Sequence, residues 1–360
     1  MIPHSRPTLG LEEKEAIESV LTTGQIAQGE KVVEFERNFC ELVGRRFAIA
    51  VSSGTSALHL AFLALEVSRG DEVILPSYTC VALLHAIDLV GAQPVLVDID
   101  LEDFNLSVKE VKKKIRRKTK AVIIPHAFGQ PARMEELLDL KVPLLEDGTQ
   151  ALGARVGRKR VGSFGGLSVF SFYATKMMTT GEGGMVLTDS RRLAERLYDL
   201  RDYDKKETYQ FRTNSKMTDL EAAMGIVQMR KLPQFLARRR EIASRYTEAL
   251  GGWGLGLPLE DPSREHAYYR YVVRLSKKKR EFMNELLARG IKVKDPVFKP
   301  LHQYLDLSDS HFPFSRQAMK ESCSLPIYPS LSDEGCEQVC QAVRDSLKEP
   351  RSEKAKLLTS

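Results

Sequence analysis

The strongest constraint on the fold is the alternation of short β-branched runs with helical patterns through the first two thirds of the chain. Most of these runs are apolar throughout, as expected of strands that are covered on both faces. The predicted strands are Phe47–Val51, Val73–Leu75, Val95–Asp98, Ala121–Ile124, Pro143–Glu146, Ser168–Ser171 and Met185–Thr188. The helices predicted between them are Ser56–Leu65, Val81–Leu89, Val108–Arg116, Met134–Leu140 and Arg191–Leu200. This pattern predicts an α/β domain with a doubly wound, mainly parallel sheet.

A different pattern begins near residue 233. A charged helix is predicted over Pro233–Leu250, and a strand over Tyr268–Leu275 follows a glycine-rich break. A helix over Lys279–Arg289 and a short strand over Ile291–Val293 come next. A final helix is predicted from an N-cap at Ser332 to about Leu347.

The length of 360 residues allows about two domains. We therefore expect a large domain over residues 1–234, with the segment 1–12 packing near the second domain. A smaller α+β domain is expected over residues 235–348. Residues 349–360 are polar and are expected to form a flexible tail.

Composition excludes several classes of protein. Lysine and arginine total 54 and the acidic residues 48, so the net charge is +6, which is too small and too dispersed to indicate nucleic-acid binding. No apolar run approaches the length of a membrane span, and the N-terminus lacks a secretory signal. Five scattered cysteines predict neither a disulfide framework nor a metal site. We therefore expect a cytoplasmic protein that binds neither nucleic acid nor membrane.

A cluster of small and hydroxyl residues follows the first predicted strand and opens the first helix, over residues 52–58. Small residues let the backbone approach an anion closely, and a helix N-terminus offers unpaired N–H groups. The hydroxyls of Ser53, Thr55 and Ser56 add donors. The cluster is interpreted as a phosphate seat, although a plain N-cap is the commoner role of such a cluster taken alone.

An acidic pair, Glu146 and Asp147, ends an apolar strand and is followed at once by small residues. Ligands of open α/β sheets bind outside the carboxyl ends of the strands, so Asp147 is expected to face a cofactor. A buried carboxylate needs a positive or hydrogen-bonding partner, and a protonated pyridinium nitrogen would be one. The alternative is a carboxylate that caps a turn or helix.

Lys176 ends a neutral stretch that begins at Ser171, and it precedes the glycine-rich turn 181–184. A lysine in a sheltered pocket can form a Schiff base because burial disfavours its charged form. A lysine without such a context is usually a surface residue. The phosphate seat, the pyridinium partner and the Schiff-base lysine are together the groups that pyridoxal 5′-phosphate (PLP) requires.

Further segments match a known family in order, from Ile2 to about residue 346. They include Gly24–Gly29, Gly70–Ser77, Gly91–Val95, Phe128–Ala132 and Asn214–Leu220. With these segments and the Lys176 motif, the chain resembles the DegT/DnrJ/EryC1/StrS family of PLP-dependent sugar aminotransferases. The resemblance implies the fold-type I architecture, with a large, doubly wound mixed-sheet domain and a smaller C-terminal α+β domain.

The resemblance also implies catalytic roles. Lys176 would be the Schiff-base lysine and would carry the proton in the 1,3-shift. Asp147 would pair with the pyridine nitrogen, and Gln150 would contact the ring or its 3′-oxygen.

Other residues would hold the phosphate of PLP. The resemblance places Gly54, Thr55 and Ser171 against it, with Ser56 in the same cluster. Asn214 would reach the phosphate of the neighbouring subunit, because members of the family are homodimers with shared active sites.

The substrate side departs from the family pattern. Cys80 stands where the family usually has a Phe or Trp that stacks on the cofactor ring, and Tyr78 is a candidate replacement. Glu182 in the glycine-rich turn and His302 resemble substrate-side residues. The segment 201–206 also differs from the family, and the acceptor could therefore be an unusual sugar.

The resemblance implies transfer of an amino group from L-glutamate to a nucleotide-linked keto sugar, with pyridoxamine phosphate as intermediate. The pathway would be amino-sugar or cell-surface polysaccharide biosynthesis. A sugar dehydratase of the same family is an alternative, but those members carry His at the position of Lys176. A sulfur-transferring lyase that uses Cys323 and a non-catalytic PLP-fold regulator are further alternatives.

Overall fold

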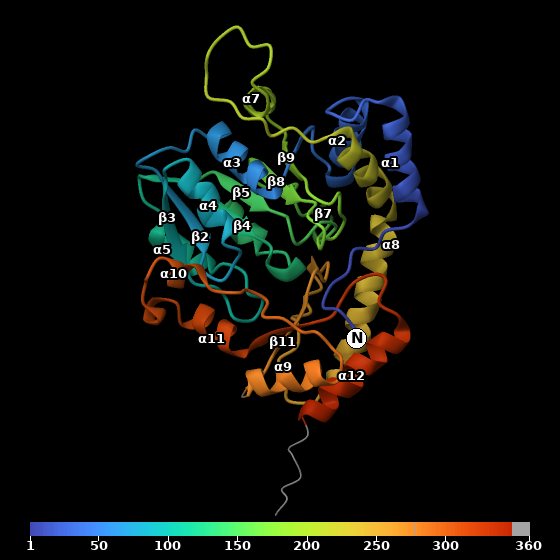
Figure 1. Cartoon of the computed structure of the whole chain (residues 1–360). Helices are drawn as coiled ribbons and strands as arrows, with labels where there is room; N and C mark the ends of the chain where they lie inside the picture. Colours follow the sequence, from blue (N-terminus) through green and yellow to red (C-terminus); the bar gives the residue numbers. More distant parts are fainter. Residues whose placement is uncertain (277, 348–360) are drawn as a thin grey trace, which may run out of the picture.

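A central mixed sheet organises the large domain of the computed structural model, which describes residues 1–276 and 278–347 (Figure 1). The sheet has seven strands in the order β1-β9-β8-β5-β4-β2-β3. Their bounds are β1 (Phe47–Val51), β2 (Glu72–Pro76), β3 (Gln93–Val97), β4 (Thr119–Pro125), β5 (Leu144–Asp147), β8 (Leu167–Ser171) and β9 (Gly184–Thr188). The predicted strands are all present, with ends that differ by one or two residues. The predicted fold class is confirmed.

The direction of the strands determines where a ligand can bind. Strand β9 is antiparallel to both β1 and β8, whereas β8, β5, β4, β2 and β3 are parallel neighbours. Strand β1 therefore runs in the same direction as β8. The carboxyl ends of β1, β2, β5 and β8 consequently meet at one edge of the sheet, where α/β proteins bind their ligands.

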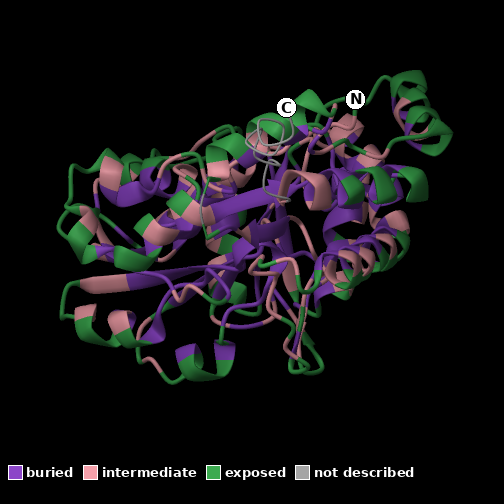
Figure 2. Cartoon of the chain, turned by 90° about the horizontal axis from the view of Figure 1, so that it is seen from below, coloured by how far each residue is buried: buried purple, intermediate pink, exposed green. Residues whose placement is uncertain are grey.

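Helices cover both faces of the sheet. One face carries α3 (Gly54–Ala64), α4 (Ala82–Leu89) and α7 (Arg191–Arg201), and the other carries α2 (Glu30–Val43), α5 (Val108–Lys114), α6 (Met134–Leu138) and α8 (Asp219–Leu250). Alternate strand residues enter the two cores: Val73 and Leu75 pack on one face and Ile74 on the other. The strands are accordingly buried in Figure 2, while the outer helix surfaces are exposed.

Two N-terminal helices, α1 (Leu11–Thr23) and α2, are absent from the sequence prediction. Each follows a glycine that has no side chain to cap the helix. The cap of α2 comes instead from Asp219, whose carboxylate accepts hydrogen bonds from Gly29 N at 2.8 Å and Val32 N at 3.0 Å. A cap supplied from so far along the chain leaves no local signature at the start of the helix.

The long helix α8 joins the two domains and is 32 residues long. The sequence predicts a start at Pro233. The helix instead begins at Asp219, because Thr218 and Glu221 form a capping box at that end. Pro233 lies inside the helix, between the buried residues Leu232 and Phe235. The boundary expected between residues 234 and 235 therefore falls within one continuous helix.

The small domain packs α8 against an antiparallel pair, β11 (Tyr271–Arg274) and β12 (Ser322–Leu325), and against α9 (Lys279–Ala288) and α12 (Asp333–Leu347). The hydroxyl of Ser332 accepts a hydrogen bond from Gly335 N at 3.1 Å, as an N-cap does. The predicted strand over residues 291–293 is reduced to an isolated bridge between Ile291 and Ile2, which attaches the N-terminal segment to this domain.

Shorter elements complete the described part of the chain. They are β6 (Arg155–Val156), β7 (Lys159–Arg160), β10 (Arg264–Glu265), α10 (Leu301–Tyr304), α11 (Pro313–Glu321) and the 3-10 helices η1 (Ala127–Gly129) and η2 (Asp309–His311). No helix among the described residues is long and apolar enough to cross a membrane. The tail predicted over residues 349–360 lies outside the described residues.

Removal of the capping box should destabilise the protein through α8. We expect Thr218→Ala to lower the free energy of unfolding by about 1 kcal/mol, because Glu221 N loses its acceptor. Thr22→Ala is the matched control, since that hydroxyl bonds only to the Glu18 carbonyl within α1. Its effect should stay within about 0.5 kcal/mol in chemical denaturation. Equal losses for the two variants would contradict the role given to the box.

Candidate active site

The turn from β1 into α3 meets the end of β8 with almost no space between the two backbones. A Cβ atom on Gly54 would lie 2.7 Å from Ser171 Cβ, and one on Gly184 would lie 2.3 Å from the Ser53 carbonyl oxygen. Ser53 caps α3 by accepting from Ser56 N at 3.0 Å. Ser53 is therefore an N-cap, as the alternative interpretation of this cluster predicted. The other N–H groups of the first turn remain available to an anion.

The two members of the acidic pair have different surroundings. Glu146 is fully buried and accepts hydrogen bonds from Gly162 N at 2.8 Å and Phe164 N at 2.5 Å. It also lies 3.7 Å from Arg45 Nη2 and 3.3 Å from His126 Nε2. These contacts satisfy the charge within the protein, so Glu146 has a structural role.

Asp147, next along β5, has far fewer partners. Its side chain is buried, and Oδ1 accepts one hydrogen bond, from Thr149 N at 3.0 Å. No cation among the described residues forms an ion pair with it. A buried carboxylate with spare acceptor capacity at the carboxyl end of a strand is suited to bind a cationic ring nitrogen.

The segment that carries Lys176 is folded back onto the end of β8. Phe172 N donates to the Gly183 carbonyl at 2.9 Å, and Thr180 N donates to the Phe172 carbonyl at 2.9 Å. Lys176 N donates to the Tyr173 carbonyl at 2.9 Å, which closes a turn. The glycine-rich turn thus supports the backbone around Lys176.

A pocket of about 550 Å³ lies between this edge of the sheet and the small domain. Its lining includes Cys80, Gln150 and Lys176 from the large domain and Tyr269, Arg270 and Lys294 from the small domain. Gln150 Oε1 accepts from Phe128 N at 2.9 Å, which orients the amide. Three residues predicted from distant motifs are thereby brought to one cavity.

Lys176 faces an aromatic ring across this pocket. Its Nζ lies 5.3 Å from the centre of the Tyr269 ring. Burial alone would raise the pKa of the Tyr269 phenol, but the positive charges of Lys176 and Arg270 hold that pKa below its usual value. Tyr269 and Arg270 were not predicted as site residues. The available signal was their position, as an aromatic residue and a cation, at the start of the strand predicted over Tyr268–Leu275.

Two predicted substrate residues lie in the core instead of the pocket. The Tyr78 ring is 2% exposed and packs against Phe104 and Phe128, so it does not replace the missing ring at Cys80. His302 is fully buried, with Nδ1 2.6 Å from Ser77 Oγ and Nε2 2.8 Å from Asp309 Oδ1. Both of its ring nitrogens are engaged within the protein, so His302 connects the end of β2 to the C-terminal part of the chain.

Two other predicted residues are exposed and do not line the pocket. Glu182 projects from the glycine-rich turn. Asn214 is also exposed, whereas its neighbours are anchored: Thr213 N donates to the Leu200 carbonyl and Ser215 N to the Arg201 carbonyl. Its backbone is held by these neighbours while its side chain is exposed.

This fold, with Lys176 and Asp147 at one edge of the sheet, defines the class of fold-type I PLP-dependent aminotransferases. The chain belongs to the DegT/DnrJ/EryC1/StrS aminotransferase family, whose profile matches residues 7–344. The predicted membership is confirmed.

Individual relatives cover nearly the whole chain. GDP-perosamine synthase of Escherichia coli O157:H7 is 34% identical over an alignment of 359 positions that covers 96% of this chain and 98% of the relative. The aminotransferase TlmJ from Streptoalloteichus hindustanus has a TM-score of 0.91 at 34% identity, over 96% of this chain and 99% of that one. DesV of S. venezuelae has a TM-score of 0.91 at 32% identity, over 94% and 95%.

The contrast between the two acidic residues is testable with isosteric variants. Glu146→Gln should lower the free energy of unfolding by about 2 to 3 kcal/mol. Gly162 N and Phe164 N donate to different carboxylate oxygens, and the amide nitrogen that replaces one of these oxygens cannot accept a hydrogen bond. Asp147→Asn should cost less than about 1 kcal/mol, since an amide oxygen still accepts from Thr149 N. Chemical denaturation measures both. A larger loss in Asp147→Asn would mean that Asp147 is structural.

Proposed function

We propose that the protein binds PLP and transfers an amino group from L-glutamate to a nucleotide-linked keto sugar. The observation that carries this proposal is the position of Lys176 in a pocket at the edge of the sheet where β1, β5 and β8 end. Lys176, in place of a histidine, argues against the dehydratase alternative.

The residues present fit PLP. A Cβ atom on Gly54 or Gly184 would clash with Ser171 or Ser53, so only glycine lets the turn before α3 pack against the ends of β8 and β9. That packing fixes the N-terminus of α3 at this edge of the sheet, where its backbone N–H groups suit a phosphate. The buried Asp147 offers a carboxylate for the pyridinium nitrogen. Thr55 and Ser56 stand in the first turn of α3, beside the same space.

When bound, PLP supplies an aldehyde that condenses with amines and a ring that withdraws electrons. Lys176 Nζ would hold the cofactor through that aldehyde and would carry the proton at the reacting carbon. Asp147 would keep the ring nitrogen protonated, and Gln150, whose amide is oriented by Phe128 N, would contact the ring. Cys80 contributes a polarisable thiol to the pocket wall.

The substrate assignment is supported by the relatives and by the pocket. The relative named GDP-perosamine synthase is named for a nucleotide-linked amino sugar, which favours a similar acceptor here. Lys294 and Lys299 add positive charge to the pocket lining, and the neighbouring Phe298 is largely exposed. Cations beside an exposed aromatic ring suit an acceptor with phosphate groups and a base.

A homodimer is part of the proposal. The segment before Asn214 carries the exposed side chains of Tyr209 and Phe211. Exposed aromatic residues beside an anchored, exposed amide fit a partner subunit whose phosphate seat Asn214 completes.

The proposed setting is the reducing cytoplasm. All five cysteines are free thiols, which fits that setting.

The Schiff-base role of Lys176 has a direct spectroscopic test. The wild-type protein with PLP should show a visible absorbance maximum that shifts when L-glutamate is added. In Lys176→Ala that maximum should be lost and turnover should fall by about 100-fold or more, since the group that moves the proton is absent. Persistence of the wild-type spectrum in this variant would make the lysine assignment wrong.

The phosphate seat is tested separately by Gly54→Ala. The added Cβ would lie 2.7 Å from Ser171 Cβ, so one of the two backbones must move. We expect the dissociation constant for PLP to rise by about 10-fold or more, which corresponds to the loss of one charge-assisted hydrogen bond. Gly166→Ala is the control, because a Cβ there meets nothing within 4 Å and its φ is not positive. Unchanged PLP affinity in Gly54→Ala would remove the seat from this turn.

A further inference from the structure

Arg270 is held rigidly at the small-domain side of the active-site pocket. Its backbone N–H donates to the Phe128 carbonyl at 3.1 Å. Just before it, the carbonyls of Tyr268 and Tyr269 accept from Nη1 of the buried Arg239, at 3.1 Å and 3.4 Å. Strand β11 begins immediately after Arg270. The Arg270 side chain therefore projects from a backbone that is fixed on both sides.

The charge of Arg270 is not neutralised within the described part of the chain. The Nη1 atom of Arg270 lies 3.4 Å from His4 Nε2, which is a long hydrogen bond. His4 carries no charge at neutral pH, since burial and the nearby Arg270 and Lys294 lower its pKa to about 3. Asp295, the acidic residue of the pocket lining, is paired with Lys279. A guanidinium in a pocket normally has an anionic partner, and residues 1–276 and 278–347 do not supply one.

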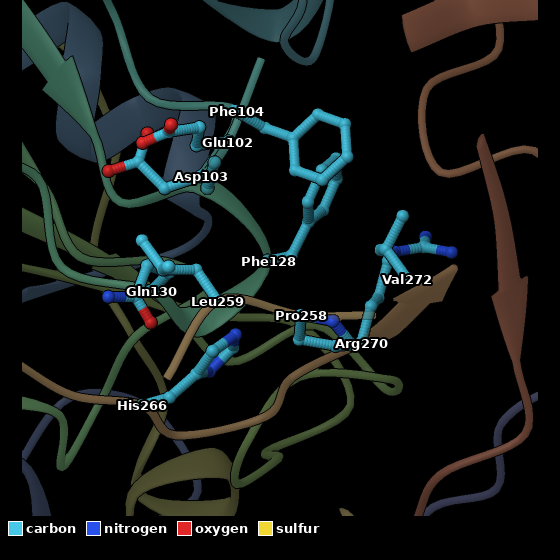
Figure 3. A pocket seen from close by; sticks show the side chains of 11 residues that line it. Glu102, Asp103, Phe104, Phe128, Gln130, Pro258, Leu259, His266, Arg270 and Val272 are labelled. Carbon is cyan, nitrogen blue, oxygen red and sulfur yellow. The ribbon is translucent and has the colours of Figure 1, made fainter. Parts of the chain in front are cut away.

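The position of Arg270 relative to Lys176 limits what that partner can be. Lys176 Nζ and the Arg270 guanidinium carbon lie 5.3 Å and 5.4 Å from the centre of the same Tyr269 ring. A single small molecule can therefore span both cations. In Figure 3 the Arg270 side chain runs past Val272, and its guanidinium points away from His266 and Gln130 in the small neighbouring cavity.

We propose that Arg270 determines specificity by binding a carboxylate of the molecule that reacts at Lys176. This inference rests on the proposed function, since it assumes that Lys176 marks the reacting carbon. Arginine suits the role because its planar fork matches a carboxylate with two parallel hydrogen bonds. Both cations line one pocket and lie near the same ring, which favours a carboxylate on the molecule that reacts at Lys176.

The carboxylate has two possible sources: the amino-acid donor, or an acidic group on the acceptor sugar. Half-reactions of the PLP-loaded protein separate them. One arm uses L-glutamate and, in reverse, 2-oxoglutarate. The other uses two nucleotide-linked keto sugars that differ only in having a ring carboxylate or a hydroxymethyl group at the same carbon.

We expect Arg270→Gln to raise the substrate concentration at half-maximal rate by about 10-fold or more in at least one arm, which is the effect of losing a charge-assisted hydrogen bond. Arg270→Lys should recover part of the loss, because charge is kept and the fork is not. Arg274→Gln is the matched control, since it removes the same charge from β11 outside the pocket lining. The absorbance of bound PLP before substrate is added should be the same in all of these variants.

An effect confined to L-glutamate and 2-oxoglutarate assigns the carboxylate to the donor, and an effect confined to the acidic sugar assigns it to the acceptor. A change of less than about 2-fold in both arms, or an equal change in Arg274→Gln, overturns the inference. If the wild-type protein shows no half-reaction in either arm, the proposed function fails. If the wild-type protein reacts and Arg270→Gln reacts equally well, only the inference about Arg270 fails.

Discussion

The close approach of three backbone segments at one edge of the sheet is the constraint on which the site depends. Ser53 and Gly54 leave β1, Ser171 ends β8, and Gly184 begins β9 between them, with no room for a Cβ at either glycine. Strand β9 lies between β1 and β8 and is antiparallel to both. Because β1 and β8 therefore run in the same direction, they end at the same edge of the sheet. The proposed phosphate seat, Asp147 and the Lys176 segment then occupy one edge without any long excursion of the chain.

Buried polar groups near this edge divide into those that the protein satisfies and those that it leaves open. Glu146 and His302 have their hydrogen-bonding capacity engaged by the protein and hold elements together. Asp147 and Arg270 are their counterparts: a carboxylate at the end of β5 and a guanidinium in the pocket lining, each without an oppositely charged partner in the described chain. Their charges suit a cationic ring nitrogen at Asp147 and a carboxylate at Arg270. The Tyr269 ring lies near both Lys176 and Arg270 and lowers the cost of holding these two cations beside one pocket.

The sequence was sufficient where local patterning determines the structure and insufficient where distant contacts do. Apolar runs predicted the strands, and motif order predicted that Gln150 and Lys176 would meet in one pocket. Helix α2 was not predictable, because its cap is the distant carboxylate of Asp219. Tyr78 and His302 have the chemistry of site residues, and only the packing of the core shows that they face inward. Tyr269 and Arg270 were missed for the converse reason, since their proximity to Lys176 depends on how the small domain folds against the sheet.

The central claim is that Lys176 is the residue that binds the cofactor covalently. Borohydride reduction of the PLP-loaded protein, followed by proteolysis and peptide mass mapping, tests it most directly, because reduction makes the bond to the lysine permanent. The account predicts a phosphopyridoxyl group on the peptide that contains Lys176. Stoichiometric labelling of a different lysine, with Lys176 unmodified, would contradict it.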